Sequence, residues 1–233
     1  MKGPLFYSKI LLFGEYGIIQ DSKGLSIPYN FYNGALKKED HPSPEAIASN
    51  GHLKRFVTYL ESLQTERPDL VQFDIATLQK DVNEGMYFDS SIPQGYGVGS
   101  SGALVAAIYD KYAQHKITVL ENLTREKLLE LKTIFSQMES FFHGKSSGLD
   151  PLNSYLSIPI LINSKDNIEA TGIPTQSFDG KGAVFLLDSG IVGETAPMVN
   201  IFMENLKDQG FRTMLKSQFV KHTDACVENF LVG

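Results

Sequence analysis

The sequence has few of the features that secreted, zinc-stabilised or membrane proteins depend on. Its single cysteine, Cys226, cannot form a disulfide within the chain, which favours a reducing compartment. No cysteines and histidines have the spacing of a zinc site. No apolar stretch approaches about 18 residues, the length that a membrane-spanning helix needs. The short apolar patch at residues 10–13 lacks the features of a signal peptide. We therefore expect a cytoplasmic protein with no membrane partner.

Basic residues are fewer than acidic residues. The chain has 21 lysines and arginines against 27 aspartates and glutamates, a formal net charge of -6. Proteins that bind nucleic acid normally show a concentrated basic face, so nucleic acid is not an expected partner. A local cationic pocket for a nucleotide remains compatible with this balance. With 233 residues, 42% of them hydrophobic, the chain can bury the core of one large domain or two modest ones.

Apolar patterning predicts a mixed α/β (α+β) chain. The clearest helix begins after Thr124. A polar stretch with glycine and proline, residues 164–182, is the best candidate for a domain boundary. Further helices are expected from Ser43, after residue 103, and at 195–205 and 211–231. Strands are expected at residues 5–13, 25–31, 71–75, 86–88, 155–162 and 183–187.

The most informative segment is PQGYGVGSSGA, residues 93–103, with four glycines and two serines before a helix of small residues. Glycine lets backbone N–H groups approach a phosphate without a Cβ in the way. The following helix offers free N–H groups and the positive end of its dipole. The segment therefore predicts an anion site, and the alternative is a tight turn with a close-packed helix.

Two other phosphate-binding motifs fit less well. Gly97, Gly99 and Gly102 satisfy G-x-G-x-x-G, but a dinucleotide fold needs an apolar strand running into the first glycine. Here the approach is polar and is broken by Pro93. Residues 144–146, Gly-Lys-Ser, resemble the end of a P-loop, but Glu139 stands where that motif needs its first glycine. We reject the P-loop.

Three charged residues could support chemistry, and each has a plainer alternative. Lys9 lies within the apolar stretch SKILLF, so it either points to the outer face or is an inward charge with a partner. Glu139 lies beside the apolar face of the long helix, where it could reach a metal or be a solvated flank residue. Asp150 precedes Pro151, which is typical of an ordinary Asp-Pro turn. Their occurrence together with a phosphate loop is what favours a catalytic site.

Four segments carry motifs in a consistent order. SKILLFGEYGII (8–19) is a lysine-bearing strand that ends in Gly-Glu, and PQGYGVGSSGALVAAIY (93–109) is the glycine loop with its helix. MESFFHGKSSGLDP (138–151) combines Glu, His-Gly and Ser-Gly-x-Asp, and FLLDSGIVGETAPMV (185–199) leads to a threonine at a helix start. Together they resemble the GHMP-superfamily kinases, and within that superfamily most the mevalonate kinases.

The resemblance implies a fold and an activity. The fold would be a ribosomal-protein-S5-like N-terminal domain, residues 1–175, followed by the start of a ferredoxin-like C-terminal domain, residues 180–233. The activity would be ATP-dependent, Mg²⁺-dependent phosphorylation of a small-molecule alcohol, with mevalonate, in isoprenoid biosynthesis, as the expected acceptor. A homodimer would be a possible assembly. Phosphomevalonate, homoserine and sugar kinases are alternatives, as is a nucleotide-binding homologue without catalysis.

The resemblance also assigns roles to residues. Asp150 would take the proton of the alcohol, and Lys9 would stabilise the alkoxide and the migrating phosphoryl group. Mg²⁺ would be held by Glu139 with Ser100 or Ser101. The nucleotide would contact the loop residues Pro93, Gly95, Gly97, Val98, Gly99, Ser100, Ser101, Gly102 and Ala103. The acceptor would contact Glu15, Tyr16, His143, Ser147 and Gly148.

The sequence departs from the family pattern at three places. Tyr16 stands where mevalonate kinases usually have histidine, which bears on the identity of the acceptor. Gly102 replaces the usual alanine, a change expected to be mild and to cost some helix propensity. The family's third motif, a glycine-rich loop near the C-terminus, does not appear. We therefore expect a truncated sequence or a shortened homologue.

Overall fold

The computed structural model describes residues 4–118, 123–174, 185–188, 190–193 and 195–232. The chain divides into two compact units. The first unit comprises residues 1–10, 28–92 and 98–157, and the second unit comprises residues 11–27, 93–97 and 158–233. The expected domain boundary between residues 175 and 180 lies outside the described residues.

Strands β1 (Phe6–Phe13) and β2 (Gly24–Lys37) contribute to both units. The strands are hydrogen-bonded in the order β1-β2-β4-β5, and β3 (Tyr87–Ser90) also pairs with β2. In the first unit β3 lies antiparallel to the end of β2, with Gly34 opposite Ser90 and Lys37 opposite Tyr87. In the second unit β4 (Ile160–Ser164) lies antiparallel to both the start of β2 and β5 (Asn167–Ala170).

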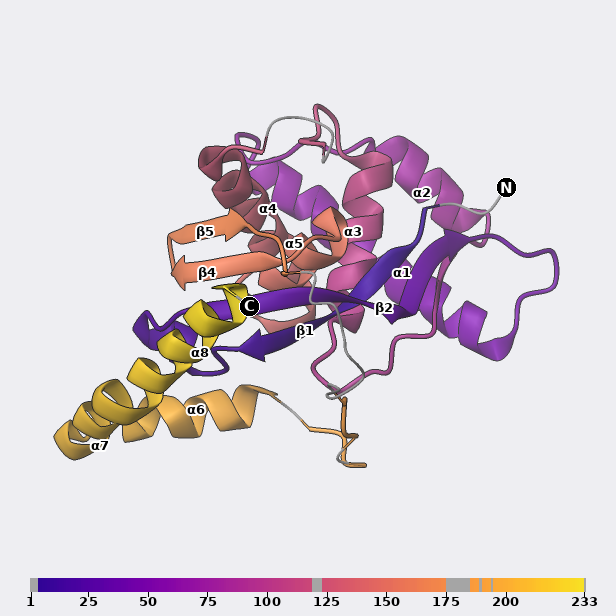
Figure 1. The fold of residues 1–233 in the computed structure, drawn as a ribbon. Helices are drawn as coiled ribbons and strands as arrows, with labels where there is room; N and C mark the ends of the chain where they lie inside the picture. Colours follow the sequence, from indigo (N-terminus) through magenta and orange to yellow (C-terminus); the bar gives the residue numbers. More distant parts are fainter. Residues whose placement is uncertain (1–3, 119–122, 175–184, 189, 194, 233) are drawn as a thin grey trace. The chain divides into compact units, whose positions relative to one another are not determined.

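Five helices form the core of the first unit, and Figure 1 shows them gathered into one cluster. Helix α3 is buried on nearly all sides, because its residues from Gly102 to Tyr109 are all small or apolar. It packs on α4 and α5, and the rings of Tyr109, Phe135 and Tyr155 meet edge to face with centroids 5.0 to 5.6 Å apart. The five helices are α1 (Pro44–Glu66), α2 (Ile75–Asn83), α3 (Ser100–Tyr112), α4 (Arg125–His143) and α5 (Leu149–Leu156).

Side-chain caps explain where three of these helices begin. The hydroxyls of Ser43 and Thr124 accept hydrogen bonds from the amides of Ala46 and Lys127, as expected for the starts of α1 and α4. The carboxylate of Asp74 caps α2 in the same way. The predicted strand at 71–75 is therefore wrong, and what remains of it is a single bridge between Phe73 and Ala113.

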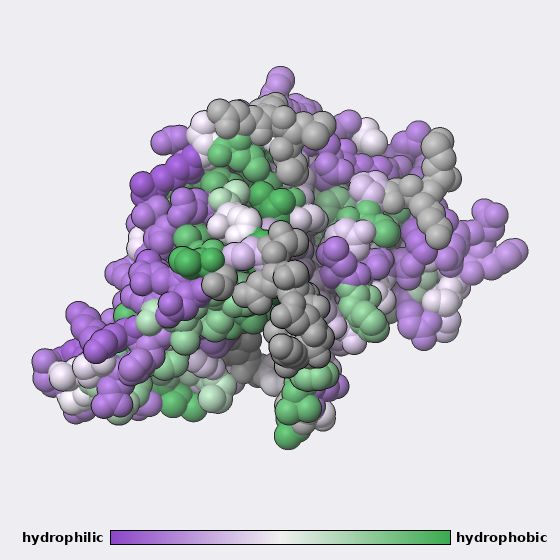
Figure 2. Space-filling model, in the orientation of Figure 1, coloured by the Kyte–Doolittle hydropathy of each residue, from purple (hydrophilic) through white to green (hydrophobic). Residues whose placement is uncertain are grey.

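Four helical segments follow β4 and β5 in the second unit. They are α6 (Thr195–Asn205), α7 (Gln209–Met214), a π-helical segment η2 (Leu215–Val220) and α8 (Lys221–Val232). Helix α8 is held by Lys23, whose amide donates to Asp224 at 2.7 Å and whose ammonium lies 2.5 Å from Glu228. Figure 2 shows apolar side chains on the visible face of α6. Met198 and Ile201 are among the exposed apolar residues of this helix. Within the described part of the chain, no helix combines the length and apolarity needed to cross a membrane.

Two further strand predictions need correction. Residues 155 and 156 of the expected strand 155–162 end helix α5, and the strand itself begins at Ile160. The expected strand at 183–187 is described only from residue 185 onward, and residues 185–187 have no strand structure there and are exposed. Both errors concern short apolar runs, for which hydrophobicity alone does not separate strand from helix or loop. The expected helix at 195–205 is confirmed.

Candidate active site

Lys9 lies on β1 and faces the interior of the first unit. Its backbone N–H donates to the carbonyl of Val98 at 3.0 Å, which joins β1 to the end of the glycine loop. Only 8% of the residue is exposed, and its Nζ lies 3.0 Å from Oδ1 of Asp150. Of the two alternatives for Lys9, the inward charge with a partner is correct and the outer-face position is wrong.

The glycine loop leads into α3, whose N-cap carries no side-chain hydrogen bond. Gly99 is the N-cap residue with φ of +83°, in the left-handed region that glycine tolerates best. A Cβ at this position would lie 3.0 Å from Cγ of Lys9. Because the first amides of a helix have no partner within it, the N–H groups of Ser100, Ser101 and Gly102 are available for an anion. The lysine is therefore packed directly against a helix N-terminus suited to phosphate.

Gly102 is required by close packing between α3 and α5. A Cβ on this residue would lie 2.8 Å from the carbonyl carbon of Asp150 and 2.8 Å from the nitrogen of Pro151. Both of these are backbone atoms, so the contact cannot be relieved by a change of rotamer. The expectation that glycine in place of alanine is a mild change here is wrong, because the missing methyl group makes room for the backbone that carries Asp150.

Asp150 belongs to the first turn of α5 and is not part of an Asp-Pro turn. Pro151 fits there because a proline in the first turn removes no intrahelical hydrogen bond. The helix begins after Gly148, whose φ is +74°, and a Cβ on Gly148 would lie 2.1 Å from the carbonyl oxygen of Lys132. The start of α5 is thus pressed onto the backbone of α4, which sets the position of the Asp150 carboxylate.

Glu139 is a buried carboxylate on α4, with 4% of the residue exposed, so the solvated-flank alternative is wrong. The Ser101 hydroxyl donates to its Oε1 at 2.9 Å, and the Ser146 hydroxyl donates to its Oε2. Burial and the charge of Asp150 raise the pKa of Glu139 to about 7, against the opposing effects of the two hydroxyls and of Lys9. A cation beside Glu139 would stabilise its charged form.

The predicted acceptor residues of the first unit lie close to this carboxylate or at the start of α5. His143, the last residue of α4, has its Nε2 3.1 Å from the Ser101 hydroxyl oxygen. The Ser147 hydroxyl accepts a hydrogen bond from the amide of Leu149 at 3.3 Å and so helps to begin α5 beside Gly148. Their contacts with an acceptor stay predictions.

Ser146 was not among the predicted site residues. It contacts Glu139 directly and accepts a hydrogen bond from the amide of Gly148 at 3.0 Å. One sequence feature could have indicated its role: Ser146 lies just past the end of the helix that carries Glu139, the candidate metal-binding carboxylate.

The remaining predicted residues belong to the second unit and are described within it. The carbonyl of Gly95 accepts a hydrogen bond from the amide of Gly193 at 3.0 Å. Tyr16 has a φ of 58° and its ring centroid lies 5.3 Å from that of Phe202.

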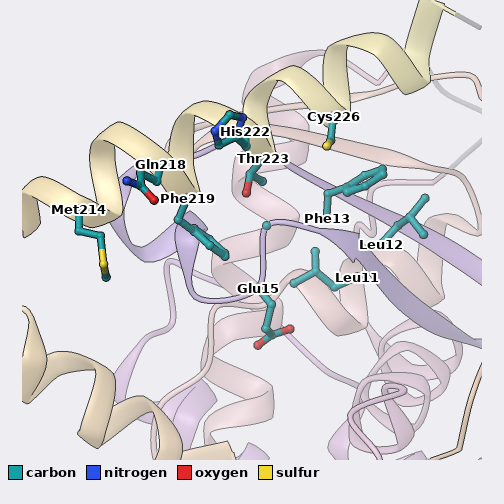
Figure 3. A pocket seen from close by; sticks show the side chains of 11 residues that line it. Leu11, Leu12, Phe13, Glu15, Met214, Gln218, Phe219, His222, Thr223 and Cys226 are labelled. Atoms are coloured by element: carbon teal, nitrogen blue, oxygen red, sulfur yellow. The ribbon is translucent and has the colours of Figure 1, made fainter. Parts of the chain in front are cut away.

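Glu15 is exposed and lines a mainly apolar cavity of about 610 Å³ (Figure 3). The cavity lies between residues 11–15 and the residues of η2 and α8 that include His222. Pro93 and Gly97, also of this unit, flank Gly95 in the chain.

One segment of the chain matches the model of a known protein family. Residues 60–157 match the GHMP kinases N terminal domain. This segment contains α3, α4 and α5 with Glu139 and Asp150. The chain carries the GHMP kinase fold.

Solved structures agree with this fold. The mevalonate kinase of Methanococcus jannaschii matches with a TM-score of 0.54 at 14% identity, covering 100% of this chain and 73% of that one. The L. major mevalonate kinase, in complex with R-mevalonate, matches with a TM-score of 0.56 at 17% identity, covering 98% and 70%. A further mevalonate kinase matches with a TM-score of 0.52 at 14% identity, covering 97% and 72%. Among curated protein sequences none matches this chain.

The predicted resemblance to GHMP-superfamily kinases, and especially to mevalonate kinases, is confirmed, as is the predicted mixed α/β fold class.

Proposed function

We propose that this chain phosphorylates a small-molecule alcohol with ATP and Mg²⁺, and that the alcohol is mevalonate. The observation that carries the proposal is the Lys9–Asp150 ion pair of 3.0 Å, which lies beside the first turn of α3. Phosphoryl transfer depends mainly on positioning and on neutralising charge, which requires a cation, a carboxylate, an amide cradle and a metal. The first unit supplies the protein groups for all four.

The residues fit the nucleotide and the metal. Mg·ATP supplies the phosphoryl group and neutralises charge on it when bound. The amides of Ser100, Ser101 and Gly102 would bind phosphate oxygens, as helix N-termini do. Glu139 and the Ser101 hydroxyl would hold the metal, with Ser100 as a further candidate. No group of three or more acidic, histidine or cysteine side chains that could hold a metal occurs among the described residues, which agrees with Mg²⁺ bound through one carboxylate together with phosphates.

Asp150 deprotonates the acceptor, and Lys9 stabilises the negative charge that develops on it. Asp150 accepts the proton of the alcohol, whose oxygen then bonds to the γ-phosphorus as the bond to the β–γ bridging oxygen breaks and ADP leaves. Lys9 stabilises the developing negative charge on the alcohol oxygen, since its ammonium already lies beside the carboxylate that takes the proton. Packing against Gly99 holds the lysine stem in place.

Mevalonate is proposed as the acceptor because the solved structures of like fold include mevalonate kinases, one of them in complex with R-mevalonate. Glu15, Tyr16, His143, Ser147 and Gly148 are the proposed acceptor contacts. A cytoplasmic location, a role in isoprenoid biosynthesis and assembly as a homodimer are further proposals that rest on the same resemblance.

A substrate panel tests this function. The full chain is incubated with radiolabelled ATP, Mg²⁺ and, in turn, mevalonate, phosphomevalonate, homoserine and a sugar, with Lys9→Met as the inactive control. We expect labelled product with mevalonate and none with the control. Turnover of another alcohol alone would replace the proposed acceptor. Binding of an ATP analogue without transfer to any alcohol would show a nucleotide-binding protein without kinase activity.

A further inference from the structure

Two serine hydroxyls hold the buried carboxylate of Glu139, and they differ in how firmly they are fixed. Ser101 lies within hydrogen-bond reach of both Glu139 and His143, at 2.9 and 3.1 Å. A serine hydroxyl has a single hydrogen, so Ser101 can direct it to either neighbour. Among its described contacts, the Ser146 hydroxyl has a single acceptor for its hydrogen. Its oxygen accepts from the Gly148 amide at 3.0 Å, which leaves its hydrogen for Oε2 of Glu139.

The backbone around Ser146 is also fixed. The Ser136 hydroxyl, one turn before Glu139 on α4, donates to the carbonyl of Ser146 at 2.6 Å. Gly148 lies so close to α4 that a Cβ would overlap the carbonyl oxygen of Lys132. Ser146 is therefore anchored to α4 through Ser136 and to the start of α5 through Gly148. Its hydroxyl is a rigid donor to Oε2 of the Glu139 carboxylate, whose Oε1 accepts from Ser101.

We propose that Ser146 is a positioning residue that holds Oε2 of Glu139 so that Oε1, with the hydroxyl of Ser101, faces a bound divalent cation. This inference rests on the proposed metal role of Glu139. Partners that orient a metal-binding carboxylate typically change metal affinity or activity by about 10- to 100-fold when they are removed. Because Ser146 also contacts Gly148, the same hydrogen bonds connect the Glu139 carboxylate to the helix that carries Asp150.

Binding of Mn²⁺ to the full chain, measured by electron paramagnetic resonance with a non-hydrolysable ATP analogue present, tests the inference without turnover. We expect Ser146→Ala to weaken Mn²⁺ binding by about tenfold or more. Ser146→Thr, which keeps the hydroxyl, should bind within about threefold of the native chain. The matched control is Ser140→Ala on the same helix, because the Ser140 hydroxyl bonds only to the carbonyl of Ser136 among the described contacts and should leave Mn²⁺ affinity unchanged.

The outcomes separate this inference from the proposed function. A native chain that binds Mn²⁺ together with a Ser146→Ala variant of equal affinity would overturn the role of Ser146 alone. A threonine variant as weak as the alanine variant would also overturn it, because the hydroxyl would not be what matters. A native chain that binds no Mn²⁺ would overturn the metal site and this inference together. If Ser146→Ala does not fold, Ser146→Cys, with a weaker donor of similar size, should show a several-fold loss, and native affinity in it would count against the proposal.

Discussion

The ammonium of Lys9 lies 3.0 Å from the carboxylate of Asp150, joining the first strand of the chain to the first turn of α5. Lys9 reaches it from beside Gly99, the N-cap of the helix that follows the glycine loop. A cation, a carboxylate and a helix N-terminus thus meet within one compact unit of the structure. This convergence is the geometric basis of the proposed phosphoryl transfer.

The first prediction concerns the role of Asp150. Asp150→Asn should lower kcat by about 100- to 10,000-fold, the range typical of a lost general base, because the amide cannot accept the proton of the alcohol. Affinity for an ATP analogue should stay within a few fold, since the carboxylate is not among the groups proposed to bind phosphate. Single-turnover kinetics and calorimetry measure the two quantities. Loss of nucleotide affinity in parallel with kcat would contradict the assigned role.

The second prediction concerns the contact between α3 and α5. Gly102→Ala should lower the free energy of unfolding by about 1–3 kcal/mol, as is usual for overpacking, because its methyl group would meet backbone atoms of Asp150 and Pro151. The shift of Asp150 should also reduce kcat. Urea denaturation and steady-state kinetics check both effects.

Gly51 offers a matched control for this substitution. It lies within helix α1, and a Cβ there would have no neighbour within 4 Å. Gly51→Ala should therefore raise the free energy of unfolding by up to about 1 kcal/mol through helix propensity, and leave kcat unchanged. Equal effects of the two substitutions would rule out a special steric role for Gly102.

The third prediction concerns pH. Because burial and the charge of Asp150 raise the pKa of Glu139 from 4.5 to about 7, the folded chain binds more protons at this group than the unfolded chain between these two values. The folded state favours the protonated form of Glu139. The stability that this form contributes is fully present below pH 4.5 and is lost as the pH rises through 7. Glu139→Gln should accordingly gain stability relative to the native chain across this window, by about 1–3 kcal/mol, since each pKa unit corresponds to 1.36 kcal/mol.

Urea denaturation at pH 5 and pH 8 measures this difference. In Asp150→Asn the pKa of Glu139 should fall, because one of the charges that raises it is removed. A constant difference between the native chain and Glu139→Gln at both pH values would show that Glu139 is not perturbed in the folded state.

Local sequence signals predicted much of the fold. The caps Ser43 and Thr124 marked the starts of α1 and α4, because a cap is formed by residues three apart in the chain. The strand that carries Lys9 and the helix after the glycine loop were also predicted. The errors at 71–75, 155–162 and 183–187 all involve short apolar runs. The structure of such runs depends on their tertiary neighbours.

The sequence by itself determined which residue types the site would contain: a lysine within an apolar strand, glycines and serines before a helix, and carboxylates at Glu139 and Asp150. Only the tertiary structure decided that Glu139 is buried, that Asp150 lies in the first turn of α5 against Gly102, and that Ser146 donates a hydrogen bond to the Glu139 carboxylate. The reason is physical. Burial and hydrogen-bond partners arise where α3, α4 and α5 pack together, and those contacts join residues that neither period nor spacing along the chain relates to one another.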